Sequence, residues 1–414
     1  MTTPTNTDVF HNPVRYGDMD SWRNEILELH AAGPIHRIEV DGVRPFWAVI
    51  GHPEVMDIER QSQLFKTEPE AILISEEMIR QRDASGINIR TIVHMDDPDH
   101  GKYRRLTSDW FKPANIGRLR GRCDELSMEA LATMRAAGGQ LDFNRDVAMV
   151  YPLQVILAIL GLPETDYSRM LKLTQEMFGS TDPDLARDAP TGEEATLALM
   201  DFYQYFTELT AARRAAPTDD LATLIANGTI DGEPLPDLES MSYYVIIASA
   251  GHDTTSASMA EGMRRLAENP AQLELLRERP DLIGNGVEEM IRLSSAVKHF
   301  MREAAEDTEI AGVPIAKGDW LMVNFAAANL DPRLFDDPLR FDVERVNADK
   351  QIAFGFGMHF CLGAQLARIE MRSLFEHLVP ALERVEVAGT PTTVQGVFVS
   401  GHKQLPIRYR LRDL

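Results

Sequence analysis

One long helical segment limits the folds open to this chain of 414 residues. The stretch Leu238–Glu268 contains no proline, and as a helix its about 31 residues would span roughly 45 Å. Its middle part, Tyr243–Ala250, is mostly apolar on every face, which a helix at the surface of a globular protein does not tolerate. We therefore expect a long central helix that passes through the middle of the molecule.

The rest of the pattern predicts a mainly α protein with small β-sheets. From about Pro53 to Ser295 the apolar spacing is mostly helical, and Pro163, Pro270 and Pro280 stand where a first-turn proline would begin a helix. Five strand-like segments are expected: Ile35–Val40 and Phe46–Ile50, which flank Asp41-Gly42 as a hairpin, then Glu309–Ile315, Trp320–Asn324 and Leu405–Leu411. No linker or repeat divides the sequence, so we expect a single domain over residues 1–414.

Composition excludes several classes of protein. An apolar share of 44% and a charged share of 26% are typical of a folded globular chain. The formal charge of −22 argues against nucleic acid as a partner, because phosphate binding needs clustered cations. Two cysteines cannot make a disulfide framework and indicate a reducing compartment. The first residues do not resemble a signal peptide, and the longest apolar run is too short for a membrane span. We predict a soluble cytoplasmic protein that does not bind membranes.

The segment Phe354–Gly363 is the strongest local signal. Two glycines before Cys361 allow a tight loop whose backbone N–H groups approach the sulfur. Helical spacing in Leu362–Leu378 would place Cys361 at a helix N-terminus, where the pKa of a thiol is lowered and thiolate is favoured. A thiolate there could be a metal ligand or a nucleophile, and the alternative is a buried structural cysteine. Cys123 lacks such a glycine-containing loop, and we expect it to be structural. One buried stripe is expected from Leu362, Leu366, Ile369 and Phe375.

The segment Ala250–Thr255 breaks the rules for a buried helix. Glycine and two threonines are poor helix residues, and Asp253 is costly to bury in an apolar stretch. A sequence that violates local rules in this way often does so for function. The neighbouring hydroxyl and carboxylate of Thr254 and Asp253 could distort the helix, hold water and relay protons. The alternative is a kinked core helix in which Asp253 is satisfied.

The segment Phe354–Gly363 resembles the haem-binding signature of the cytochrome P-450 family, although Met358 stands where many members carry arginine. The resemblance implies the cytochrome P-450 fold, with haem b between the long central helix and the cysteine loop with its helix. Cys361 would then be the axial thiolate ligand of the haem iron. In the same loop the resemblance implies that Phe354 covers the ligand, that His359 points at a haem propionate, and that Gly363 belongs to the haem-binding set.

The segment Ala250–Thr255 is similar to the oxygen-activation motif of the same family. By this resemblance Thr254 would hydrogen-bond to dioxygen, Asp253 would pass protons inward, and Ala250 with Gly251 would leave room for dioxygen and substrate. His252 occupies a variable position, and we expect it to make a local polar contact rather than to bind iron.

Three further stretches resemble family elements in the same order. Glu289 and Arg292 form an E-x-x-R pair, spaced for an ion pair on one helical face, to which we assign a structural role. His100 and Arg104, together with Arg302, stand where family members bind the propionates, and a buried dianion needs such cations. Asn329–Arg345 resembles the meander before the cysteine loop. A small departure is Ala296, where many members carry proline.

Electrons would have to come from a partner, because the chain leaves no room for a flavin domain. Lys102–Arg122 carries seven cations against one acid, Asp109. We predict that an acidic iron–sulfur ferredoxin, served by a flavoprotein reductase, docks there; the alternative is a solvated helix face. Substrate would enter on the other haem face, under a mobile cover formed by Thr67–Val93 and Asp166–Ala212. The resemblance implies candidate pocket walls, which are mostly apolar as expected of a ligand pocket, and core packing is the alternative for each: Ile246, Ser249, Ala250, Val297, Phe300, Val397 and Phe398.

Two segments narrow the substrate class. Val297–Arg302 and Phe398–Lys403 resemble bacterial monoterpene-oxidising members, notably the terpineol-hydroxylating group. Within the haem-thiolate monooxygenases that the family resemblance implies, this favours an enzyme that hydroxylates a small terpenoid or alkyl-aromatic compound. The family resemblance also implies a monomer. The alternatives left open are a steroid or fatty-acid hydroxylase, a peroxide-driven haem oxygenase, a haem-binding sensor, and a cysteine hydrolase that uses Cys361.

Overall fold

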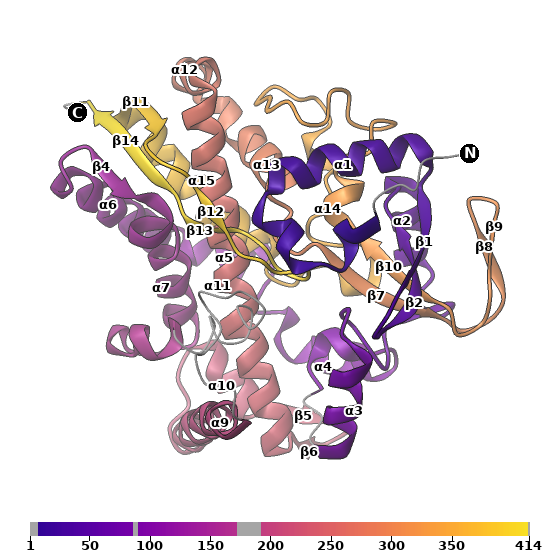
Figure 1. Ribbon diagram of the computed structural model, residues 1–414. Coiled ribbons are helices and arrows are strands. Elements are labelled where there is room, and N and C mark those ends of the chain that lie inside the picture. Colours follow the sequence, from indigo (N-terminus) through magenta and orange to yellow (C-terminus); the bar gives the residue numbers. More distant parts are fainter. Residues whose placement is uncertain (1–6, 86–89, 172–191, 413–414) are drawn as a thin grey trace. The chain divides into compact units, whose positions relative to one another are not determined.

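The computed structural model describes residues 7–85, 90–171 and 192–412 (Figure 1). Helices predominate in this part of the chain, as the sequence predicts, and its strands form small sheets. Contacts divide the chain into two compact units, each assembled from three segments. Unit 1 comprises Met1–Asn88, Glu261–Cys361 and Pro391–Lys403, and unit 2 comprises Ile89–Ala260, Leu362–Thr390 and Gln404–Leu414. The single domain stays a prediction.

Unit 1 holds most of the sheet structure. Its helices are α1 (Met19–Ala32), α2 (His52–Arg60), α3 (Glu76–Ser85), α12 (Pro270–Glu278), α13 (Ile283–Ser294), α14 (Phe325–Ala328) and the 3-10 helices η1 (Thr7–Phe10), η2 (Pro13–Gly17), η7 (Pro280–Leu282), η8 (Ala348–Lys350) and η9 (Gly357–His359). Its strands are β1 (Ile35–Val40), β2 (Val43–Val49), β3 (Phe65–Lys66), β7 (His299–Ala304), β8 (Thr308–Ile310), β9 (Val313–Ile315), β10 (Trp320–Asn324), β12 (Thr392–Thr393) and β13 (His402–Gln404).

The largest sheet in the described chain has the strand order β1-β2-β10-β7-β3. Strand β10 runs parallel to β2 and antiparallel to β7, and Leu321 of β10 pairs with Arg302 of β7. Buried residues of the sheet, including Val49 and Val323, share one hydrophobic cluster with Ile58 of α2. This packing fixes α2 on the sheet that carries Arg302.

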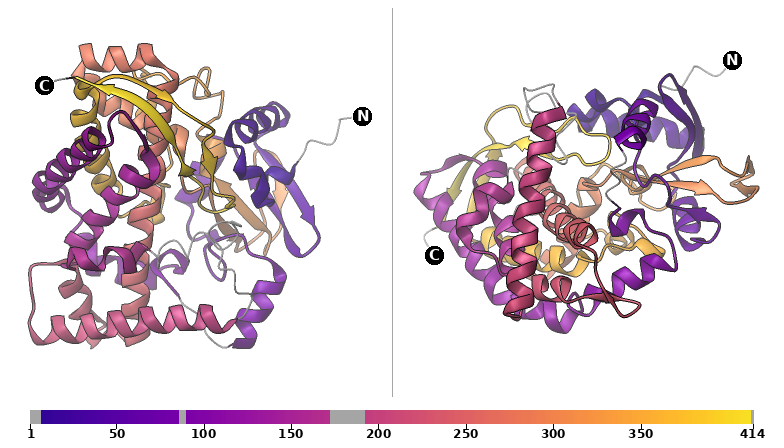
Figure 2. Two further views of the ribbon diagram at one scale, coloured as in Figure 1. Left: turned by 60° about the vertical axis from the view of Figure 1, so that its left-hand side comes forward. Right: turned by 90° about the horizontal axis from the view of Figure 1, so that it is seen from below.

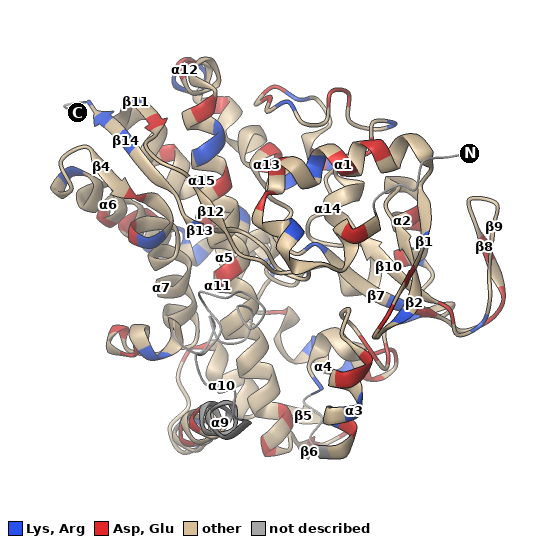
Figure 3. Cartoon of the chain, in the orientation of Figure 1, with Lys and Arg blue, Asp and Glu red and all other residues tan. Residues whose placement is uncertain are grey.

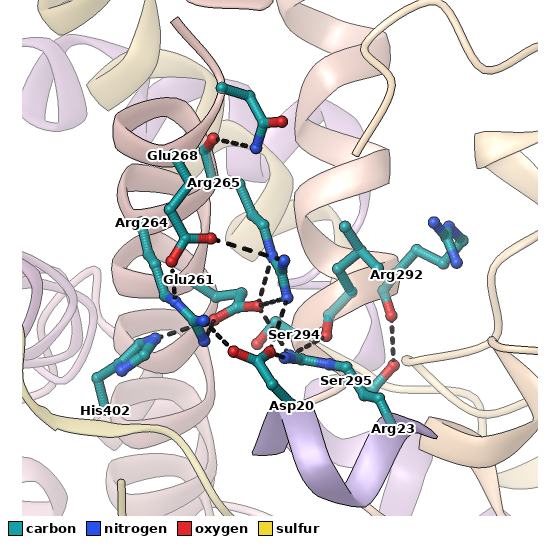
Figure 4. Close-up of polar contacts among 12 residues, drawn as sticks. Asp20, Arg23, Glu261, Arg264, Arg265, Glu268, Arg292, Ser294, Ser295 and His402 are labelled. Carbon is teal, nitrogen blue, oxygen red and sulfur yellow. Dashed lines mark hydrogen bonds and ion pairs between the residues drawn. The ribbon is translucent and has the colours of Figure 1, made fainter. Parts of the chain in front are cut away.

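A buried ionic network ties α1 to the end of α11 and to β13 within unit 1 (Figure 4). Glu261 lies 2.7 Å from Arg23 and 2.7 Å from Arg265, and His402 lies 2.9 Å from its other oxygen. Burial alone would raise the pKa of Glu261, but the two guanidinium groups and His402 hold it well below its usual value. The network therefore keeps a carboxylate charged inside the fold.

Unit 2 is mainly helical. Its helices are α4 (Asp99–Ser108), α5 (Pro113–Ile116), α6 (Arg120–Ala136), α7 (Val150–Ile159), α9 (Gly192–Ala215), α10 (Leu221–Ala226), most of α11 (Asp237–Glu268), α15 (Ala364–Ala381), the 3-10 helices η3 (Ile92–His94), η4 (Gly117–Leu119) and η6 (Glu164–Asp166), and the π-helix η5 (Asn144–Ala148). Its strands are β4 (Gln140–Asp142), β5 (Thr229–Ile230), β6 (Glu233–Pro234), β11 (Leu382–Val387) and β14 (Pro406–Leu411). Helices α6 and α7 and helices α6 and α15 pack side by side (Figure 2).

The long helix predicted over Leu238–Glu268 is confirmed, since α11 runs unbroken over Asp237–Glu268. The side chains of Tyr243, Tyr244, Val245 and Ala248 are buried, as expected where every face is apolar. The helical assignment continues through Ala250–Thr255. None of the helices in the described residues is both long and apolar enough to cross a membrane.

Other predictions meet mixed outcomes. The hairpin forms as β1 and β2, and Pro270 and Pro280 begin α12 and η7. The single strand expected over Glu309–Ile315 is wrong, because Ala311 and Gly312 both adopt positive φ and turn the chain between β8 and β9. In the stripe predicted after Cys361, Leu366 and Phe375 are buried, whereas Leu362 and Ile369 are only partly buried. The predicted cover segments include 86–89 and 172–191, which lie outside the described residues.

Candidate active site

The loop before Cys361 depends on two glycines. Gly355 and Gly357 have φ of +70° and +67°, a region that side-chain-bearing residues rarely adopt. A Cβ on Gly357 would lie 2.2 Å from the backbone oxygen of Glu59 on α2, so only glycine fits. The Cys361 N–H then donates to the Phe354 carbonyl at 2.8 Å and closes the loop. The loop is thus held against α2 within unit 1.

The two cysteines differ sharply in exposure. Cys123, on α6, is fully buried, and burial raises the pKa of its thiol to about 12. Cys361 is exposed and precedes Gly363, the N-cap residue of α15, by two positions. The beginning of α15 at Ala364 agrees with the helix predicted after the loop. Of the two thiols, only that of Cys361 is accessible to a metal or a ligand.

A buried ion pair lies next to this loop in unit 1. Arg302 of β7 lies 2.7 Å from Glu59 of α2, and both side chains are at most 4% exposed. Burial raises the pKa of Glu59, and Arg302 opposes that shift. His359, in the cysteine loop, has its Nε2 3.0 Å from the hydroxyl of Thr67. His359 and Arg302 thus have protein partners, Thr67 and Glu59, that the local sequence does not predict.

Glu289 and Arg292 form the ion pair that their spacing predicts. The guanidinium binds both carboxylate oxygens, at 2.7 and 2.8 Å, and neither side chain is exposed. Arg292 also donates to the carbonyls of Asn329 and Pro338, and Arg345 donates to Glu289 at 3.0 Å. The pair therefore joins α13 to the segment that precedes the cysteine loop.

The motif of α11 lies in unit 2. The Thr254 hydroxyl donates to the Ala250 carbonyl at 2.7 Å, and a Cβ on Gly251 would lie 2.5 Å from Ile156 of α7. Asp253 is partly buried, and its Oδ2 is a buried atom without a hydrogen-bond partner among the described residues. An unpaired buried oxygen is costly, and it distinguishes Oδ2 of Asp253 from Oδ1, which lies 3.1 Å from Nδ1 of His252. His252 is fully buried.

Comparison with known proteins identifies the family. The sequence model of cytochrome P450 matches residues 165–393. The chain belongs to the cytochrome P450 family. "Cytochrome P450-terp" of a Pseudomonas species is 38% identical over 96% of this chain and 95% of its own. A steroid C26-monooxygenase of Mycolicibacterium smegmatis is 31% identical over 93% and 90% of the two chains. Linalool 8-monooxygenase of Pseudomonas putida is 31% identical over 87% and 89%. The crystal structure of a cytochrome P450 from Novosphingobium aromaticivorans superposes with a TM-score of 0.90 at 40% identity and covers 98% of both chains.

This cytochrome P450 is accordingly an enzyme of the monooxygenase class, and its cofactor is haem with a cysteine thiolate on the iron. The residues of unit 1 fit that group. The exposed thiol of Cys361 suits an iron whose other ligands belong to a macrocycle. Phe360 beside Cys361 is 38% exposed, which leaves an apolar surface that a flat ring could cover.

The remaining predicted propionate residues lie in unit 2. His100 is buried on α4, and Arg104 is partly buried one turn later. Helix α4 belongs to unit 2, whereas Cys361 belongs to unit 1, and the role of His100 and Arg104 toward haem stays a prediction.

The predicted pocket walls fall into two groups. In unit 1, Val297, Phe300, Val397 and Phe398 are all partly exposed. The rings of Phe300 and Phe398 lie 5.3 Å apart, and Lys298 N–H donates to the Phe398 carbonyl. In unit 2, Ala250 is exposed and Ile246 partly buried, whereas the buried Ser249 hydroxyl donates to the Val245 carbonyl. Ser249 therefore has its hydroxyl occupied by its own helix.

Proposed function

We propose that this cytochrome P450 inserts one oxygen atom of O2 into a small hydrophobic substrate. The reaction balances as RH + O2 + 2e⁻ + 2H⁺ → ROH + H2O. Bound haem supplies the iron at which dioxygen is activated, with Cys361 as its thiolate ligand. The observation that carries the proposal is the pair of Asp253 and Thr254 on α11, because a carboxylate with one buried, unpaired oxygen beside a hydroxyl suits the delivery of the two protons.

Asp253 and Thr254 divide the proton work in this proposal. The unpaired Oδ2 of Asp253 holds and releases the proton, and the Thr254 hydroxyl orients it toward the reacting oxygen. The hydroxyl now donates to the Ala250 carbonyl but retains lone pairs that can accept a hydrogen bond. Asp253→Asn should therefore lower the product formed per electron pair by about 100-fold and raise the peroxide released. The size of the substrate-induced spin shift should not change.

The cationic residues would hold the haem propionates. Arg302, His359, His100 and Arg104 are the proposed set, and Glu59 would fix the Arg302 guanidinium from its other side. Phe354 and Gly363 complete the proposed haem-binding loop, and Glu289 with Arg292 supports it structurally. Arg302→Leu should weaken haem retention, measured as the rate of haem transfer to apomyoglobin. An unchanged rate would remove Arg302 from this set.

For the substrate we propose a terpenoid or alkyl-aromatic compound that is hydroxylated. Support comes from the relative named linalool 8-monooxygenase and from the apolar side chains of the proposed wall. A relative named for steroid oxidation keeps the steroid hydroxylase as the second candidate. A panel of terpenes, alkyl-aromatics, steroids and fatty acids, scored by the low-to-high-spin shift, tests both. A shift with terpenes or alkyl-aromatics alone supports the proposal, and a shift with steroids or fatty acids alone contradicts it.

We further propose that electrons arrive from an acidic ferredoxin at Lys102–Arg122. Acids from elsewhere in unit 2 neutralise part of this region: Lys102 pairs with Asp231, and Arg122 lies 2.8 Å from Glu164. Acidic and basic residues are mixed along α4 and α6 (Figure 3). Arg105 is exposed and has no ion pair within the described chain, and we therefore propose that the ferredoxin docks at this residue and its surroundings.

Arg105→Glu should slow reduction by ferredoxin without changing the substrate-induced spectrum. The matched control is Arg135→Glu, another exposed arginine of unit 2 outside the proposed patch. Equal reduction rates for the two variants would refute docking at Arg105. The proposal also includes a cytoplasmic location and a monomeric state. Size-exclusion chromatography with light scattering would test the monomeric state.

Peroxide-driven oxygenation is the competing haem chemistry. It supplies both oxygen and protons with the peroxide and therefore has no need of Asp253 and Thr254. Product labelled from ¹⁸O2 and dependent on reductant supports the monooxygenase. Product formed equally well with hydrogen peroxide, and unaffected by Asp253→Asn, would favour the alternative.

A further inference from the structure

His252 lies at the centre of the α11 motif but has no place in the function proposed above. Its side chain is fully buried, and its Nε2 lies 2.9 Å from the carbonyl oxygen of Met149, which directly follows the π-helix η5. A carbonyl oxygen can only accept a hydrogen bond. The Nε2 atom therefore carries a hydrogen.

The other ring nitrogen faces the catalytic acid. Nδ1 of His252 lies 3.1 Å from Oδ1 of Asp253. If the ring were neutral, with its hydrogen on Nε2, Nδ1 would present a lone pair to a carboxylate oxygen. Two lone pairs at this distance repel each other in a buried setting, where water cannot screen them. A proton between Nδ1 and Oδ1 removes that repulsion.

We propose that His252 and Asp253 share one proton in the gap between Nδ1 and Oδ1, and that His252 is a positioning residue for proton delivery. The shared proton belongs either to an imidazolium beside a carboxylate or to a carboxylic acid beside an imidazole. In both cases Oδ1 is held by His252, which leaves Oδ2, the oxygen without a partner, as the atom that exchanges protons. This inference rests on the function proposed for Asp253.

The charged residues of the two segments η5 and α7 are accounted for. Of the segments in contact with Ala250–Thr255 through Met149 and Ile156, η5 contributes Arg145 and Asp146, which pair with each other at 2.8 Å. Helix α7 contributes no charged residue, and its Tyr151 donates to the Cys123 carbonyl. No charged side chain of these two segments is thus left over to compensate the Asp253 carboxylate or a protonated His252.

Two substitutions separate the tasks of the ring. In His252→Asn the amide N–H can take the place of Nδ1–H and still donate to Asp253, but it cannot give up or take up a proton. In His252→Gln the longer amide can keep the bond to the Met149 carbonyl while Nδ1 is lost. Asp253→Asn removes the acid and serves as the reference for the proposed function.

The first readout is spectroscopic and independent of turnover. Nuclear magnetic resonance of protein labelled with ¹⁵N in the histidine rings should show a far-downfield proton on or near Nδ1 of His252, slow to exchange with D2O. That signal should vanish in Asp253→Asn. A wild-type Nδ1 without a bound or shared proton, or a signal that survives in Asp253→Asn, would overturn the inference.

The second readout is the coupling of electrons to product. His252→Gln should lower the product formed per electron pair by roughly tenfold and raise the solvent isotope effect, with an unchanged carbon monoxide spectrum. His252→Asn should show the same raised isotope effect. An isotope effect equal to that of the wild type would mean that only the orientation of the carboxylate matters, and it would overturn the proposal of a shared proton. Normal coupling in His252→Gln with impaired Asp253→Asn overturns this inference alone, whereas normal coupling in Asp253→Asn overturns the proposed function.

Discussion

Substitution of the three glycines around Cys361 by alanine separates two physical costs at the cysteine loop. Gly363 has φ of −84°, and a Cβ there would meet no atom within 4 Å. Gly355 has φ of +70°, and its added Cβ would make only ordinary contacts, the nearest at 3.7 Å. Gly357 combines φ of +67° with a Cβ placed 2.2 Å from the Glu59 backbone oxygen. Gly363→Ala thus carries neither cost, Gly355→Ala carries only the strain of a positive φ, and Gly357→Ala carries both that strain and a clash.

The magnitudes follow from these geometries. Gly363→Ala should change the free energy of unfolding little, since neither strain nor a clash arises. Gly355→Ala should cost ~1–2 kcal/mol, the penalty for a side-chain-bearing residue in the left-handed region. Gly357→Ala should cost that amount plus ~1–3 kcal/mol for the displacement that an overpacked site imposes. Because the oxygen belongs to the backbone of α2, no side-chain rotation can relieve the clash.

Urea unfolding, followed by far-ultraviolet circular dichroism and by haem absorbance, measures the ranking. We expect the transition midpoint to fall in the order Gly363→Ala, Gly355→Ala, Gly357→Ala, with haem loss most pronounced in the last variant. Equal midpoints for Gly355→Ala and Gly357→Ala would refute the close approach of the loop to α2. A fall of the midpoint in Gly363→Ala as large as in Gly355→Ala, without loss of haem, would refute the assignment of the costs to φ and contact.

Two further predictions concern buried charges in unit 1. Glu289→Gln should lower the free energy of unfolding by ~3–5 kcal/mol, because it leaves the buried Arg292 uncompensated. The control Glu77→Gln breaks the exposed pair with Arg80 at the same spacing and should not change the urea midpoint. Equal effects of the two substitutions would contradict the reasoning. Burial lowers the pKa of Lys298 from its ordinary value of 10.5 to about 7. Between these two pH values the side chain is protonated in the unfolded chain but neutral in the native state. The free energy of unfolding therefore increases as the pH rises through this range. The difference in unfolding free energy between wild type and Lys298→Met should therefore change in favour of wild type from pH 7 to pH 9 and stay constant below pH 6, and a difference independent of pH throughout would contradict a neutral buried lysine.

The sequence predicts those features that depend on residues close together in the chain. Helix α11 follows from its uninterrupted apolar composition, and the hairpin of β1 and β2 follows from alternation around Asp41-Gly42. The E-x-x-R pair forms because residues three apart lie on one helical face. The turn at Ala311 cannot be predicted from the sequence, because alanine gives no signal for positive φ.

Long-range pairs could not be predicted from local pattern. Glu59 and Arg302 stand far apart in sequence, and only the packing of α2 on the sheet that contains β7 brings them together. The charge count over Lys102–Arg122 overstated the basic patch for the same reason, since Asp231 and Glu164 lie outside the counted segment. The contact of His252 with Met149 likewise depends on how η5 meets α11.

The account depends most on the thiolate of residue 361 as the protein ligand of the haem iron. The spectrum of the reduced protein under carbon monoxide tests it in three samples: wild type, Cys361→Ala and Cys123→Ala. We predict the strongly red-shifted band of a thiolate-ligated haem in wild type and in Cys123→Ala, and its absence in Cys361→Ala. Persistence of that band in Cys361→Ala, or its loss in a folded Cys123→Ala, would contradict the assignment.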